Sequence, residues 1–229
     1  TAAPRGGGRF FCYKGLHYSV KKPIFVSNHL SITMFLPPAG GYRTLRAYQL
    51  SEIIYDLTAV FVRRFIPYGS RTTDQMVQAA RSGKQNIAEG SVASATSKET
   101  EIKLTNVAKA SLEELLLDYE DYLRQHSLPY WDKRHPRFPA LSAYLKSQAF
   151  MDAPMKHAET YSAEEFCNLA ITLIYQDIYL LRHLIAEQQR QFVENGGIKE
   201  MMYRARTSRF AKKSDPSDPS DPSDPKKHK

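Results

Sequence analysis

Hydrophobic side chains recur every three or four positions over four long stretches of this 229-residue chain, and no stretch alternates as a strand does. This period places apolar residues on one face of a helix. We therefore predict an all-α fold with helices over about 42–65, 72–89, 96–125 and 162–195. Three of them carry long apolar stripes: Ala47, Leu50, Ile54, Leu57, Phe61 and Phe65; Leu104, Ala108, Leu112, Leu115, Tyr119 and Tyr122; Phe166, Leu169, Ala170, Leu173, Leu180, Leu181 and Leu184.

Capping signals set the ends of these helices. Thr96 with Glu99, and Ser162 with Glu165, each have the spacing of a capping box at a helix start. Gly90 is expected to end the second helix, and Gly196 the fourth. Four amphipathic helices without strands predict an up-down-up-down four-helix bundle.

The rest of the chain divides around a folded part at 34–197. Residues 1–33 lack a clear period, so we interpret them as a non-core leader, native or added, with Met34 as the natural start. Residues 126–161 form a proline- and aromatic-rich insertion with one short helix near 138–147. We expect a short helical suffix at 198–210 and a disordered tail at 211–229, where SDP repeats forbid a helix.

The second predicted helix has two unusual faces. One is mostly small, with Ala80 and Gly83 between Met76 and Ile87, so another helix can approach closely. We interpret the opposite face as an oligomer interface or the wall of a wet channel, although a merely polar outer face fits equally well. Its residues are short or uncharged for the most part: Gln75, Gln78, Ser82, Gln85 and Glu89. Glu89, expected in the last turn, should have a cationic or N–H partner.

The formal net charge of +8 is concentrated at the two ends of the chain. Within the folded part, residues 43–109 hold ten basic and six acidic side chains, whereas residues 110–165 hold six basic and ten acidic. This split favours either a nucleic-acid surface or stacking of basic on acidic faces between copies. The candidate nucleic-acid-binding residues are Arg43, Arg46, Arg63, Arg64, Arg71, Arg81 and Lys84, with a second cluster at Arg204, Arg206 and Arg209.

Two acidic residues interrupt apolar stripes. Asp177 lies between Leu173 and Leu181, and Glu101 lies near the start of the third helix. An unpaired buried carboxylate is costly, so we expect both to be structural buried charges that are paired or face a polar cavity. Arg46 and Lys84 are the candidate partners.

The residues that carry chemistry show no catalytic or metal-binding spacing. Cys12 and Cys167 are isolated, and the seven histidines form no HxxxH or HExxH motif. Two cysteines do not make a disulfide framework, so a reducing, cytoplasmic location is expected. We predict a protein that is not an enzyme, uses no cofactor or metal, and does not span a membrane.

The segment RTTDQMVQAARSGKQNIAEG, residues 71–90, resembles the signature of the bacterial four-helix-bundle proteins known as 23S rRNA intervening-sequence proteins. KASLEELL at 109–116 matches the same family, and GGIKEMMYRARTSRF at 196–210 looks like the suffix of one branch. Relatives include the accessory variability protein of diversity-generating retroelements. The resemblance, over about 34–210, therefore implies a homopentameric ring that binds nucleic acid and a reverse transcriptase through basic surface.

Together these observations predict an accessory scaffold that binds RNA or DNA. The alternative is a protein-interaction module that docks a partner enzyme, such as a reverse transcriptase, without affinity for nucleic acid.

Overall fold

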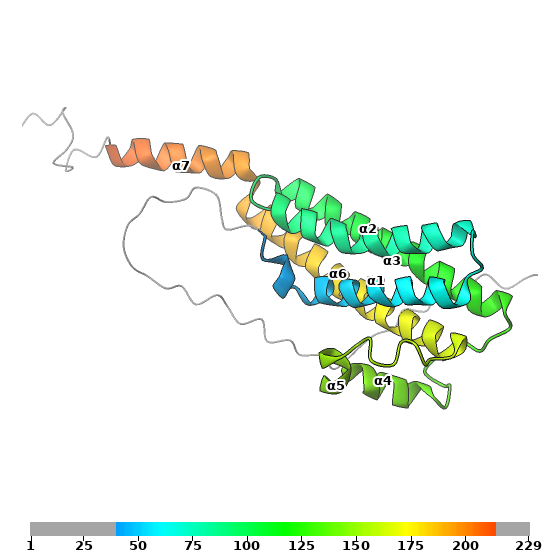
Figure 1. The fold of residues 1–229 in the computed structure, drawn as a ribbon. Helices are drawn as coiled ribbons and strands as arrows, with labels where there is room; N and C mark the ends of the chain where they lie inside the picture. Colours follow the sequence, from blue (N-terminus) through cyan, green and yellow to red (C-terminus); the bar gives the residue numbers. More distant parts are fainter. Residues whose placement is uncertain (1–39, 214–229) are drawn as a thin grey trace, which may run out of the picture. The chain divides into compact units, whose positions relative to one another are not determined.

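The computed structural model describes residues 40–213, within the unit that begins at Leu36. These residues are all-α, as predicted, and include no strand (Figure 1). The predicted leader and the SDP repeats lie outside the described residues. In chain order the elements are the 3-10 helix η1 (Gly41–Thr44), α1 (Arg46–Phe65), α2 (Arg71–Ala93), α3 (Lys98–Gln125), α4 (Phe138–Lys146), α5 (Gln148–Asp152), α6 (Ala163–Asn195) and α7 (Ile198–Lys213).

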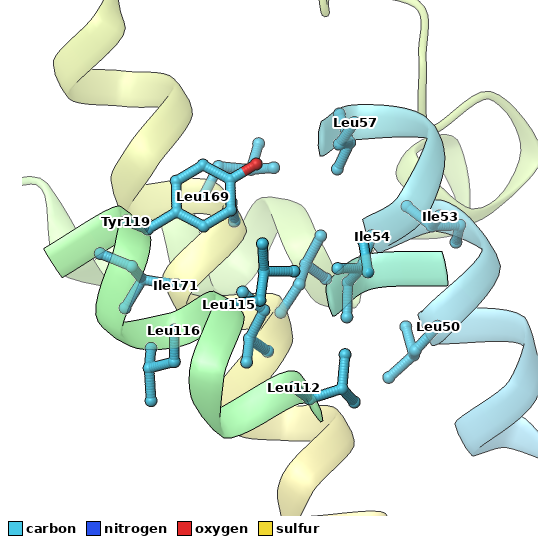
Figure 2. Packing of buried hydrophobic residues seen from close by; sticks show 14 of the residues in the cluster. Leu50, Ile53, Ile54, Leu57, Leu112, Leu115, Leu116, Tyr119, Leu169 and Ile171 are labelled. Atoms are coloured by element: carbon cyan, nitrogen blue, oxygen red, sulfur yellow. The ribbon is translucent and has the colours of Figure 1, made fainter. Parts of the chain in front are cut away.

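The four long helices pack pairwise around a shared apolar core. α1 packs against α2 and α6, and α3 packs against the same two helices. Figure 2 shows side chains of α1, α3 and α6 pointing toward one another, and the labelled Leu57, Leu112 and Leu115 are fully buried. Each buried leucine contributes about 1.5–3 kcal/mol relative to an exposed one. Most of the stripe residues that the sequence predicts are therefore buried in this core. Phe65, Tyr122, Leu180 and Leu184 are partly buried against it, and Leu104 lies outside the cluster.

Close packing of α2 on α3 explains both glycines of α2. A Cβ atom added at Gly83 would lie 2.9 Å from Leu112 Cδ2, and one at Gly90 would lie 3.3 Å from the Glu101 carbonyl oxygen. The predicted end of this helix at Gly90 is wrong, because Gly90 is a packing position and the helix continues to Ala93. Glu89 consequently lies before the last turn, where the helix dipole acts on it only weakly.

The helix starts agree with the sequence in one case and differ in another. Ser162 and Glu165 form the predicted capping box of α6, and Gly196 ends that helix with φ 74°. The predicted cap at Thr96 is wrong, because Ser97 accepts the hydrogen bond from the Thr100 amide at 3.1 Å.

The insertion contains the predicted short helix, α4, and also α5, which its sequence pattern does not show. Phe150 anchors α5, since its side chain is fully buried and its ring lies 5.3 Å from that of Tyr144. The insertion therefore adds its own apolar residues to the core rather than forming an open loop. The suffix helix α7 extends to Lys213, three residues beyond its predicted end.

Candidate nucleic-acid and assembly surfaces

Two arginines at the end of α1 hold the insertion in place. Arg64 donates hydrogen bonds to the carbonyl oxygens of Ala158 and Tyr161, at 2.6 and 2.8 Å. Arg63 forms an ion pair with Glu159. Both side chains were predicted to bind nucleic acid, but in this arrangement they contact residues of their own chain. The guanidinium of Arg64 is the stronger clamp, because it makes two charge-assisted hydrogen bonds and is half-buried.

Two further predicted phosphate contacts, Arg46 and Lys84, are also engaged within the protein. Arg46 is half-buried and its Nη2 donates to the sulfur of Met151 at 2.7 Å, which ties α1 to α5. The Lys84 ammonium lies 4.3 Å from the centre of the Tyr55 ring, a cation–π contact between α2 and α1. These cations are therefore less available to a ligand than their charges alone suggest.

The other predicted cations are exposed. Arg43 lies on η1, and Arg71 and Arg81 lie on α2. Arg204 and Arg206 are exposed on α7, while the side chain of Arg209 lies outside the described set. The structure thus divides the candidate residues into cations that contact their own chain, on α1 and at Lys84 of α2, and exposed cations on η1, α2 and α7.

The predicted interface stripe of α2 also divides into two parts. Gln75, Gln78 and Glu89 are exposed and Gln85 is half-buried. Ser82 faces α3, because its Oγ lies 2.9 Å from Ser111 Oγ. Ser82 therefore contributes to the packing of α2 on α3, and the outer part of the stripe consists of the glutamines and Glu89.

The two predicted buried charges have different surroundings. Glu101 is half-buried, forms a 2.8 Å ion pair with Lys98 and accepts a hydrogen bond from Gln188 at 3.2 Å. Asp177 is fully buried, and neither carboxyl oxygen has a hydrogen-bond partner. Burial raises the pKa of Asp177 well above its usual range, and the charge of Arg46 acts in the opposite direction. Arg46 is thus an electrostatic neighbour of Asp177 without forming a hydrogen bond to it.

One cluster at the start of the insertion was not predicted. The side chain of Asn168, on α6, accepts a hydrogen bond from the Trp131 amide at 2.7 Å and donates one to the Pro129 carbonyl at 3.0 Å. Trp131 Nε1 donates to Glu164 at 2.7 Å. The available signal was a polar asparagine within the apolar run of the last long helix. Its role is to fix the chain that leads into the insertion.

Groups with reactive potential are buried or scattered. Among residues 40–213, no group of three His, Cys, Asp or Glu side chains is arranged to hold a metal ion. Cys167 is buried, and this burial raises the pKa of its thiol, so the nucleophilic thiolate is disfavoured.

Comparison with protein-family models, curated proteins and solved structures gives no match to this chain. The segment Ala163–Arg204 is long and apolar enough to cross a membrane by length and composition. The core helix of a soluble protein passes the same test, and 56% of its most apolar window is buried inside this structure.

Proposed function

We propose that this protein is a non-enzymatic accessory scaffold of the bacterial cytoplasm that binds RNA or DNA through the basic surface of a homo-oligomeric ring. In this proposal α1, α2, α3 and α6 form an up-down-up-down four-helix bundle, and five copies close the ring. The cyclic packing of the four helices supports the bundle. The likeness of residues 71–90 to the 23S rRNA intervening-sequence proteins supports the ring.

Exposed arginines without acidic partners carry the nucleic-acid proposal. Arg71 and Arg81 on α2, and Arg206 on α7, are exposed, and none forms an ion pair with another side chain of the described region. Phosphate groups neutralised by such side chains release counterions, which supplies affinity without sequence preference. Repetition around a ring would multiply these contacts on one ligand.

The polar face of α2 supports self-association. Interfaces between proteins are depleted of charged groups relative to other surface. Gln75 and Gln78 give α2 two exposed, uncharged, hydrogen-bonding side chains on a face that also carries Arg71 and Glu89. On α3, Leu117 keeps 61% of its surface exposed in the single chain. Contact between copies would bury this apolar side chain.

The proposal is tested by titrating fluorescently labelled RNA and DNA with the full chain at two salt concentrations. We expect binding that weakens steeply with salt, because phosphate contacts dominate affinity. The variant with R71A and R81A should show weaker binding and a smaller salt slope. R63A, at a cation already paired with Glu159, is the matched control and should bind as the wild type does. Absence of binding at low salt would exclude the nucleic-acid function.

The alternative is a module that docks a partner enzyme such as a reverse transcriptase. The observation that favours it is exposed apolar surface on α3, where Val107 and Leu117 are 40% and 61% exposed. Under this alternative, L117D abolishes capture of the partner, while the full chain shows no affinity for nucleic acid at any salt concentration.

A further inference from the structure

Basic and aromatic residues alternate along one side of α7. Lys199, Tyr203, Arg206, Phe210 and Lys213 follow one another at spacings of four, three, four and three residues. Spacings of three and four bracket the 3.6-residue helical turn, so these five positions share one stripe. The stripe runs for about 21 Å along the helix axis. We call these five residues the α7 stripe.

The described side chains in the middle of the α7 stripe are open to solvent. Tyr203 keeps 69% of its surface exposed, and Arg206 is exposed beside it. Within the described region, the Tyr203 ring makes no aromatic contact and its hydroxyl no hydrogen bond. Hydrogen bonds from the backbone and from Ser97 to the Glu99 carboxylate lower its pKa most, and the charge of Lys199 lowers it further. Lys199 is therefore partly engaged with Glu99. Tyr203 and Arg206 are thus the side chains in the middle of the stripe that are open to a ligand.

An exposed aromatic ring between cations suits an unpaired nucleotide strand. The cations neutralise successive phosphates, while the flat ring offers a stacking surface to a base of any sequence. In a duplex the bases already stack on one another, so their faces are closed to a side chain on the outside. The stripe thus offers a contact that a single strand can use and an intact duplex cannot.

The charge pattern of α7 is unsuited to a lipid surface. A helix that lies on a membrane needs a continuous apolar face opposite its basic face. The apolar face of α7 covers only its first half, and the same helical register continues into Arg209 and Lys212. The residues of that apolar half are Ile198, Met201, Met202 and Ala205.

We propose that α7 is a binding site for single-stranded nucleic acid, in which Tyr203 stacks on a base and Arg206 contacts the adjacent phosphate. This assignment rests on the proposed nucleic-acid function and names its ligand class. It places strand recognition on α7, whereas Arg71 and Arg81 of α2 supply contacts that single strands and duplexes share.

The test measures fluorescence anisotropy of a labelled 20-nucleotide single strand and the matching duplex with the full chain. We expect the single strand to bind at least about tenfold more tightly. Y203L should weaken single-strand binding about fivefold or more, since stacking on an aromatic side chain contributes substantially for each base. Y203F keeps the ring and should retain wild-type affinity. Y68L removes a fully exposed tyrosine from the loop before α2 and is the control.

The outcomes separate this inference from the function on which it rests. Three results would overturn the α7 site: wild-type affinity in Y203L, an equal loss of affinity in Y68L, or binding of the duplex as tight as that of the single strand. If that binding still weakens with salt, the proposed nucleic-acid function would stand. No binding of either ligand at low salt, or binding only to anionic lipid vesicles, would overturn both. Circular dichroism of Y203L should match the wild type, because Tyr203 is exposed and lies outside the buried core.

Discussion

Arg46 of α1 and Asp177 of α6 are electrostatic neighbours, yet no hydrogen bond joins their side chains. The guanidinium of Arg46 instead donates to the sulfur of Met151, from the insertion, at 2.7 Å. Asp177 is left fully buried, and burial raises its pKa well above the usual range. The core therefore favours the neutral acid at this position, while Arg46 connects the core to the insertion.

Asp177 should make stability fall as pH rises. Its pKa is higher in the folded chain than in the unfolded chain, where it is about 3.9. The contribution of Asp177 to stability is therefore complete below its pKa in the unfolded chain. It is lost as the pH rises through its pKa in the folded chain. D177N does not titrate, so the wild type should lose stability relative to it as the pH rises above about 4, the pKa of the unfolded chain. Urea unfolding at several pH values measures the difference, and a difference that stays constant would refute the assignment.

The same site permits a prediction at fixed pH. D177L replaces an unsatisfied carboxyl by an apolar side chain of similar size, which should stabilise the protein by about 1–3 kcal/mol at pH 7. Thermal and urea unfolding measure the gain. The control is D74L on the exposed first turn of α2, which should not stabilise the fold. A loss of stability in D177L would show that the carboxyl has a favourable partner.

Gly83 should tolerate no larger side chain. A Cβ there meets Leu112 at 2.9 Å, and Leu112 is itself fully buried in the core. G83V should destabilise the fold by about 1–3 kcal/mol through overpacking, because this cost exceeds the smaller gain in helix propensity from glycine to valine. G41V is the matched control, because a Cβ at Gly41 meets nothing within 4 Å. Equal unfolding midpoints for the two variants would contradict the close packing of α2 on α3.

Arg64 should control the stability of the insertion. Removing its two hydrogen bonds to the carbonyls of Ala158 and Tyr161 costs about 1.5–3 kcal/mol for each charge-assisted bond. R64A should therefore open the insertion locally and speed tryptic cleavage within 126–161 at least about tenfold. R71A removes an exposed arginine without such contacts and serves as the control. Cleavage at the wild-type rate in R64A would mean that other contacts, such as the Trp131–Glu164 hydrogen bond, suffice.

The glutamines of α2 should control assembly. Placing carboxylates at both positions, in Q75E with Q78E, puts like charges on a face that we expect to meet another copy. Like charges at an interface oppose association. The oligomer should therefore dissociate at low ionic strength, where salt screens this repulsion least. Q189E, on an exposed position of α6, should leave assembly unchanged. Identical sedimentation of the two variants would place the interface elsewhere.

The periodic stripes made the long helices predictable, because each apolar residue repeats the same physical requirement along the chain. Leu57, Leu112 and Leu115 are buried as their spacing indicates. The ends of the helices were harder, since they depend on single side chains. Thr96 and Ser97 are both good caps, and only the local turn selects Ser97. Gly90 has the sequence of a helix terminus but serves as a contact with α3.

The role of a charged side chain was predicted less well than its position. Arg63 and Arg64 have the same sequence signature as Arg71 and Arg81, but of these only Arg63 and Arg64 bind residues of the insertion in the described part of the chain. What separates the two pairs is the insertion, whose path across α1 is set by contacts distant in sequence. No periodic pattern in residues 126–161 indicates that Ala158 and Tyr161 present their carbonyl oxygens to Arg64. Tertiary contacts of this kind decide which cations remain available to a ligand.

Sedimentation equilibrium of the full chain at micromolar concentration tests the proposed assembly most directly. The account predicts a closed homo-oligomer with a mass of about five times the 26.1 kDa of one chain. A single species at 26.1 kDa would contradict it.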